Sequence, residues 1–235
     1  MNNDMNKAPQ TVPVITVDGP SGAGKGTIAS RLAKTLGFHF LDSGALYRLL
    51  ALQALNLGMK PEQIPELAAE AAKLPVRFEE SAGEIKIYLE NKEVTNKIRS
   101  EDVAGMASQV ASIPEVRTAL LQRQRDFQQA PGLVADGRDM GTVVFPQAEL
   151  KIFLTASAEE RAQRRVKQLK EKGEDANIST ILQAIRERDE RDKNRSVAPL
   201  VPAEDAINID TTGIGIDTVF SRAMAAIEGS SFYSK

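Results

Sequence analysis

The chain has 235 residues, of which 42% are hydrophobic and 26% are charged, a composition typical of a globular protein with a substantial core. Thirty Lys and Arg residues against 32 Asp and Glu residues give a formal charge of -2, so the overall basic character expected of a nucleic-acid binder is absent. With no cysteine and one histidine, His39, the sequence excludes disulfides and a cysteine-rich zinc site and leaves a Ser–His relay without its parts.

The sequence also predicts where the protein resides. Residues 1–12 are polar, lack the apolar core of a signal peptide and are expected to form a flexible tail. The longest uncharged apolar stretch, Leu49 to Met59, is far shorter than the roughly 20 residues of a spanning helix. We therefore expect a cytoplasmic monomer with neither membrane nor nucleic-acid partners.

The first predicted elements alternate between strand and helix. The apolar, β-branched run VITVD at 14–18 indicates a strand buried on both faces of a parallel sheet. A glycine-rich turn follows, and apolar residues every four positions predict a helix over about 25–36. A second strand at 38–41 and a leucine-rich helix complete a βαβ outline.

The pattern changes between about 61 and 129. An Ala/Glu/Leu helix precedes the alternating runs VRFEE and IKIYLE, which are joined by Ser-Ala-Gly-Glu and predict a hairpin. Two helices follow, at about 101–112 and 115–129, separated by Pro114, which fits only an early position of the second helix. We interpret residues 61–112 as an inserted α+β substrate subdomain.

The α/β rhythm then resumes with strands at 133–136, 150–154 and 207–209. Ser157 and Glu160 form a capping-box pattern at the start of the next helix, and further helices are predicted over about 178–191 and 214–228. Five strands alternating with helices predict an α/β fold, an open and mostly parallel sheet flanked by helices.

A phosphate-binding loop lies between the first strand and the first helix, with the sequence GPSGAGKGT from Gly19 to Thr27. Its glycines allow a tight turn that directs backbone N–H groups at phosphate oxygens, while Lys25 and the helix N-terminus add positive charge. The motif departs from its usual form at Gly26, because the hydroxyl residue comes one position later as Thr27. Whether this loop holds magnesium directly or through water is left open.

Other motifs narrow the class of nucleotide-binding protein. The three Asn-Lys pairs, at 6, 91 and 96, do not continue as Asn-Lys-x-Asp, which argues against a GTPase. The run LVAD ends at Asp136, but Gly137 follows where a motor ATPase would carry a water-activating Glu. The residues alone therefore indicate a P-loop phosphotransferase acting on a small substrate.

Two charged segments have both functional and structural interpretations. Arg188, Asp192 and Arg195 share one helix face, yet such runs are often solvated surfaces with weak ion pairs. The segment 136–139 follows a strand at the carboxyl edge of the sheet, where open α/β folds bind ligands, although an ordinary polar turn is the alternative. Ser43 follows Asp42 at a helix start, so both are candidate capping residues. His39 is expected to be a packed or edge residue.

Five segments of the chain resemble bacterial cytidylate kinases: GPSGAGKGT, LDSGALYR at 41–48, SQVASIPEVR at 108–117, ADGRDMGTVVFP at 135–146 and RERDERDKNRSVAPLVPA at 186–203. The resemblance implies one P-loop kinase domain over 1–235, with a core of 13–60 and 113–228, a monophosphate-binding insert at 61–112 and a short lid with its following helix at 172–196. It also implies magnesium-dependent transfer of the γ-phosphoryl group of ATP to CMP or dCMP.

The same resemblance assigns the site residues. It places Gly19, Pro20, Ser21, Gly22, Ala23, Gly24, Lys25, Gly26, Thr27, Arg161 and Arg165 at ATP, with Lys25, Arg138 and Arg188 as catalytic residues. The implied CMP site contains Ser43, Tyr47, Arg48, Ser108, Arg117, Arg138, Asp139, Arg188, Asp192 and Arg195. Within it Ser108, Arg117 and Asp139 would read cytosine, Arg48 and Arg138 the acceptor phosphate, and Asp192 the sugar. Thr27 and Asp136 would contact magnesium, through water in the case of Asp136.

Two alternatives stay open. Phosphoryl transfer to a phosphate needs positioned cations rather than a general base, so a kinase for UMP, dTMP or AMP would use the same machinery and differ only in the residues that read the base. A non-catalytic nucleotide-binding regulator would bind without turnover, although Lys25 and the arginines argue against it.

Overall fold

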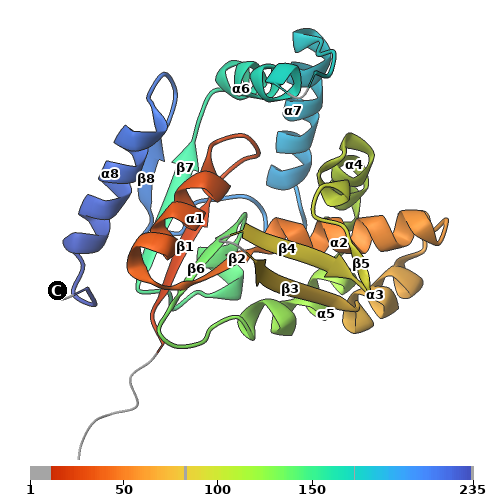
Figure 1. Cartoon of the computed structure of the whole chain (residues 1–235), viewed down its shortest axis with the longest axis horizontal. Helices are drawn as coiled ribbons and strands as arrows, with labels where there is room; N and C mark the ends of the chain where they lie inside the picture. Colours follow the sequence, from red (N-terminus) through yellow and green to blue (C-terminus); the bar gives the residue numbers. More distant parts are fainter. Residues whose placement is uncertain (1–11, 82–83, 172, 234–235) are drawn as a thin grey trace, which may run out of the picture.

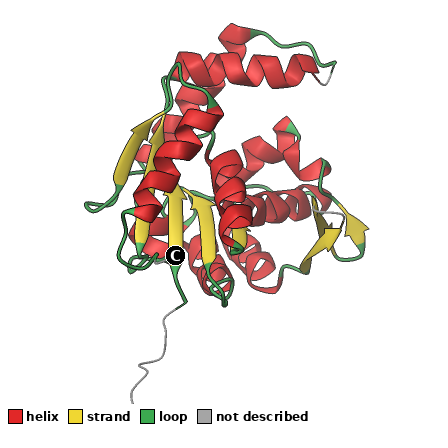
Figure 2. Cartoon of the chain, turned by 60° about the vertical axis from the view of Figure 1, so that its left-hand side comes forward, coloured by secondary structure: helices red, strands yellow, loops and turns green. Residues whose placement is uncertain are grey.

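A computed structural model describes residues 12–81, 84–171 and 173–233 (Figure 1). Almost all of the predicted tail at 1–12 lies outside these residues. A central sheet is covered by helices on both faces, and a pair of helices projects beyond one end of it (Figure 2). No helix within the described part of the chain has both the length and the apolar character needed to cross a membrane.

The central sheet has the parallel architecture that the sequence predicts. Its strands are β1 (Val14–Asp18), β2 (His39–Asp42), β6 (Leu133–Gly137), β7 (Leu150–Thr155) and β8 (Ile207–Asp210), arranged in the order β2-β6-β1-β7-β8. All four pairings are parallel, so every strand ends at the same edge. Strands β2 and β6 lie on one side of β1, and β7 and β8 lie on the other. This reversal makes the carboxyl end of β1 the switch point where ligands of open sheets bind.

The central strands are buried on both faces because two hydrophobic clusters lie against the sheet. Along β1 all five residues are buried, with Val14 packing into one cluster and Ile15 and Val17 into the other. Helices α1 (Lys25–Leu36) and α8 (Ile216–Glu228) cover the second face, and α2 (Ser43–Asn56) covers the first. The β-branched run therefore folds as a fully buried strand, as predicted.

The segment between α2 and β6 contains α3 (Ile64–Lys73), β3 (Val76–Ser81), β4 (Glu84–Leu89), β5 (Lys92–Glu93), α4 (Glu101–Val110) and α5 (Pro114–Arg125). The predicted hairpin is formed by β3 and β4, and the short β5, which the sequence did not indicate, extends it. Pro114 starts α5, as predicted, but the helix ends at Arg125 and not near 129. The small sheet and these helices share one hydrophobic cluster with α2.

Helices α6 (Ala158–Glu171) and α7 (Ile178–Lys193) form the projecting pair, called the arm below (Figure 1). The backbone N–H of Glu160 donates to Ser157 Oγ at 3.1 Å, so half of the predicted capping box is present. The other half is missing because the Glu160 carboxylate accepts from Arg164 Nε at 3.0 Å instead. The arm follows β7 directly, which places its base at the carboxyl edge of the sheet.

Candidate active site

The phosphate loop joins β1 to α1 at the switch point of the sheet. Gly19 has a φ of +145°, and a Cβ at this position would lie 2.0 Å from the backbone oxygen of Leu154 in β7. Only glycine can therefore bring the loop this close to the neighbouring strand. Gly22 and Gly24 also have positive φ values, so the curvature depends on the glycines of the motif.

Three carbonyl groups of this loop accept hydrogen bonds from side chains. Lys25 Nζ donates to the carbonyl of Pro20 at 3.0 Å, and Arg161 Nη1 donates to that of Ser21 at 3.1 Å. Thr211 Oγ1 donates to the carbonyl of Ala23 at 3.2 Å and accepts from Arg164 at 3.0 Å. The loop conformation is thus supported by contacts with the arm and with the residue after β8.

Lys25 and Asp136 form a buried pair beneath the loop, with Nζ and Oδ1 3.9 Å apart. Burial, together with the positive charge of Arg138, lowers the pKa of Lys25 to about 8, while burial raises the pKa of Asp136 to about 6. A Cβ on Gly26 would approach Asp136 Oδ2 to 3.2 Å. The glycine at this motif position therefore leaves room for the carboxylate, and the next residue, Thr27, is exposed.

Three arginines converge on Asp192, which is completely buried in α7. Arg138 Nε donates to Asp192 Oδ2 at 2.9 Å, Arg195 donates to the other carboxylate oxygen, and Arg188 Nε lies 4.0 Å from Oδ2. These cations hold the pKa of Asp192 below its usual value despite its burial. Burial and the charge of Arg138 lower the pKa of Arg188 to about 9, and its buried Nε has no hydrogen-bond partner. Such uncompensated positive charge favours binding of an anion.

A second ion pair joins α5 to the turn after β6. Arg117 donates to Asp139 and, through Nη1, to the carbonyl of Ala111 at 3.0 Å, and all of these groups are buried. The Arg117 guanidinium also lies 5.5 Å from the centre of the Tyr47 ring, a cation–π arrangement. The pair presents a carboxylate and a guanidinium at one place, which is the combination that can read the edge of a nucleobase.

The remaining predicted site residues have protein partners in this structure. Ser43 Oγ donates to Gln124 at 2.6 Å, while Asp42 caps α2 by accepting from Ala45 N at 3.0 Å. Ser108 Oγ accepts from Arg191 Nε at 3.3 Å, and Arg48 Nη1 donates to the carbonyl of Ile98 at 2.9 Å. Arg161 is bound bidentately by Asp189, and Arg165 pairs with Glu101 of α4.

Several residues around the site were not anticipated from the sequence. Predicted site residues or their backbone are contacted by Gln124 on α5, Asp189 and Arg191 on α7, and Thr211 after β8. Asp18, the last residue of β1, instead accepts from the two backbone N–H groups that follow Asp139. Only Asp18 carried a usable signal, because a charged residue at the end of a buried strand, directly before the phosphate loop, must lie at the switch point.

The sequence is similar to that of known proteins over almost its whole length. Residues 15–229 match the family model described as cytidylate kinase. This chain belongs to the cytidylate kinase family. It is 57% identical over 220 residues to the cytidylate kinase of Aeromonas hydrophila, covering 94% of this chain and 96% of that protein. With the cytidylate kinase of Stutzerimonas stutzeri it shares 59% identity over 219 residues, 92% of this chain and 95% of that protein.

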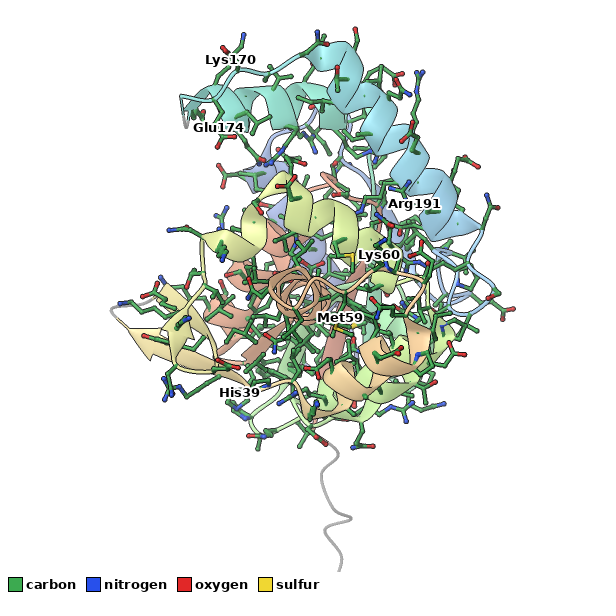
Figure 3. All side chains as sticks on the ribbon, turned by 90° about the vertical axis from the view of Figure 1, so that its right-hand side faces the viewer. His39, Met59, Lys60, Lys170, Glu174 and Arg191 are labelled. Atoms are coloured by element: carbon green, nitrogen blue, oxygen red, sulfur yellow. The ribbon has the colours of Figure 1, made fainter. Side chains whose placement is uncertain are left out.

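Membership of the cytidylate kinase family confirms the resemblance that the five segments indicated. The family match spans the phosphate loop, the turn after β6 and the arm in one stretch. His39, the single histidine, lies far from the arm on the edge strand β2 (Figure 3), where its Nε2 is 3.0 Å from the carbonyl of Ala130. Its position agrees with the expectation of an edge residue.

Proposed function

We propose that this enzyme transfers the γ-phosphoryl group of ATP to CMP and dCMP, producing ADP and CDP or dCDP. The observation that carries the proposal is the arginine cluster around Asp192, which lies next to the phosphate loop and contains more positive charge than its carboxylate neutralises. Two adjacent anion sites are what transfer between two phosphates requires.

The phosphate loop would hold the donor. Its backbone N–H groups, the N-terminus of α1 and Lys25 face the β- and γ-phosphates in this proposal, and a bound anion would favour the charged form of Lys25. A magnesium ion carried by ATP would neutralise charge on the phosphate oxygens. The donor set fits it, because the exposed Thr27 hydroxyl and the Asp136 carboxylate flank Gly26, and no cluster of three metal-binding side chains competes among the described residues.

The acceptor phosphate would lie among Arg48, Arg138 and Arg188. At neutral pH its oxygen is largely ionised, so it attacks the γ-phosphorus without a general base, and the bond from γ-phosphorus to the β,γ-bridging oxygen breaks as ADP leaves. The arginines orient the attacking oxygen in line and stabilise the charge of the transferring group. Arg161 and Arg165 would meet ATP from the arm once their present carboxylate partners are exchanged for phosphate.

The base of the acceptor would meet Ser108, Arg117 and Asp139. The Asp139 carboxylate can accept from the amino group of cytosine, and the Arg117 guanidinium can donate to its N3 and O2 acceptors. In uracil the amino group is replaced by O4, an acceptor, which would face the carboxylate without a hydrogen between them. Residues 61–112 would then act as the monophosphate-binding insert, and 172–196 as the lid and its following helix.

The decisive experiment measures ADP formation with Mg-ATP and CMP, dCMP, UMP, dTMP or AMP in turn. We expect fast turnover with CMP and dCMP and much slower turnover with UMP. A preference for another monophosphate would retain the phosphate chemistry but overturn the roles of Ser108, Arg117 and Asp139. Nucleotide binding without turnover of any acceptor would favour the regulator.

The arginine cluster makes a sharper prediction for Arg188→Ala. Because Arg188 lies on the acceptor side, we expect kcat/KM for CMP to fall on the order of 10²-fold while KM for ATP changes less than about threefold. The matched control is Arg186→Ala on the same helix, whose exposed side chain pairs with Glu159. Steady-state kinetics with each substrate varied decide it, and an equal rise in KM for ATP and for CMP would contradict the assignment to the acceptor side.

A further inference from the structure

Both carboxylate oxygens of Asp18, the last residue of β1, accept hydrogen bonds from the turn that follows β6. Oδ1 accepts from the backbone N–H of Met140 at 2.9 Å and Oδ2 from that of Gly141 at 2.8 Å, and the side chain is buried. Asp18 directly precedes Gly19 of the phosphate loop, yet its contacts are with the segment that follows β6 on the acceptor side.

The turn held by Asp18 packs closely against strand β1 of the central sheet. A Cβ on Gly141 would come within 2.8 Å of Thr16 Oγ1, so the backbone is already in contact with β1. The carbonyl of Asp139 accepts from Val143 N at 2.9 Å and Val144 N at 3.2 Å as the chain enters a π-helical turn, Met140–Val144. Asp18 therefore anchors the first two residues after Asp139, and the π-helical turn fixes the rest.

A continuous set of buried contacts leads from Asp18 to the Arg117–Asp139 ion pair. Asp139 is one residue before the anchored amides and accepts from Arg117, which in turn is held by the carbonyl of Ala111. On the other side, Arg138 reaches Asp192 in the arginine cluster. A shift of this turn would displace Asp139 and Arg138 together, while the phosphate loop has its own supports from Arg161 and Thr211.

We propose that Asp18 is a positioning residue for acceptor recognition: its two hydrogen bonds to Met140 and Gly141 set the position of Asp139 and thereby the discrimination between cytosine and uracil. The inference rests on the proposed function. It predicts an effect on base discrimination and not on ATP binding. Base discrimination depends on hydrogen-bond geometry held within about half an ångström, whereas the donor loop has its own supports.

The test is Asp18→Asn at pH 8, where most Asp18 side chains are ionised in the native enzyme. An amide of the same shape keeps one acceptor oxygen but presents an NH₂ group to the other backbone N–H, so one of the two contacts becomes repulsive. We expect the ratio of kcat/KM for CMP to that for UMP to fall about tenfold and KM for ATP to change less than about twofold. This ratio does not depend on the fraction of active enzyme, so a purely structural loss would leave it unchanged.

The matched control is Glu149→Gln, which alters a carboxylate that accepts from Val14 N at 2.7 Å, at the opposite end of the same strand. We expect this control to keep the CMP-to-UMP ratio. An unchanged ratio in folded Asp18→Asn, or an equal rise in KM for ATP and CMP, overturns the inference.

If Asp18→Asn does not fold, Gly141→Ala displaces the same turn from the other side and should lower the same ratio, and an unchanged ratio there overturns the inference equally. Failure of the proposed function itself is distinguishable, because native enzyme would then not phosphorylate CMP.

Discussion

The buried carboxylates of the site show how the neighbours of a side chain determine its charge. Asp192 has three arginine neighbours, and their attraction outweighs burial, so its pKa stays low. Asp18 accepts only two backbone N–H groups while the charges of Asp139 and Asp136 repel its own, so burial dominates and raises its pKa to about 7. Residues of one type therefore differ in protonation because their neighbours differ.

The raised pKa of Asp18 predicts a pH-dependent stability. Folded protein retains a proton on Asp18 between about pH 4 and pH 7, where the unfolded chain does not, so its contribution lowers the free energy of unfolding as the pH rises through this window. Urea unfolding of native protein and Asp18→Asn at pH 5 and pH 8 measures it. We expect native protein to lose more stability than the variant on going to pH 8. An equal loss in both would show that Asp18 does not titrate in this window.

At the scale of elements, the phosphate loop depends on segments remote from it in sequence. Its backbone is contacted by the arm through Arg161, by the residue after β8 through Thr211 and by β7 through the close approach of Gly19. Arg164 completes the support by donating to both the hydroxyl and the carbonyl of Thr211. The loop is therefore shaped by three neighbouring elements as well as by its own glycines.

Thr211→Val tests this support, because valine keeps the shape of the side chain and removes the hydroxyl between Ala23 and Arg164. We expect KM for ATP to rise several-fold, KM for CMP to stay within about twofold, and stability to fall by about 1–2 kcal/mol. Thr118→Val is the control, since that hydroxyl donates to Pro114 within its own helix at 3.0 Å. Kinetics and urea unfolding measure both effects, and a larger rise in KM for CMP than for ATP would refute the assignment.

At the scale of the whole molecule, the arm and α4 approach each other across the site. Arg165 of α6 pairs with Glu101 of α4, and Arg191 of α7 donates to Ser108 of α4. The first contact is exposed, so it contributes little to stability, about 1 kcal/mol or less. Phosphate groups bound between these elements would add stronger bridges and draw the arm towards α4.

This geometry predicts that both nucleotides together protect the arm from trypsin, more than either nucleotide alone. The physical reason is that phosphate oxygens would bind arm arginines, leaving them less accessible to the protease. Gel analysis of cleavage within 164–193 measures the protection. Glu101→Gln should speed cleavage without nucleotides, whereas Asp102→Asn, a matched change in the same first turn of α4, should not. Equal cleavage with and without both nucleotides would exclude closure of the arm.

Much of the fold could be predicted because its signals are local. The β-branched run at 14–18, the apolar spacing over 25–36 and the position of Pro114 each indicate an element through residues that are close together in the sequence. The phosphate loop was also predictable, since its glycines impose the turn and Lys25 the charge. Five motif segments then carried the family resemblance that the match over 15–229 confirms.

The sequence by itself determined the strand–helix alternation, the phosphate loop and the family. Only the tertiary structure decided which polar groups meet: Asp18 bonds an amide 122 residues away, and Thr211 a carbonyl 188 residues away. Such partners leave no periodic or local pattern, because sheet order and the direction of the arm bring them together. For the same reason Asp192, on a charged helix that resembles a solvated surface, proved to be the completely buried centre of an arginine cluster.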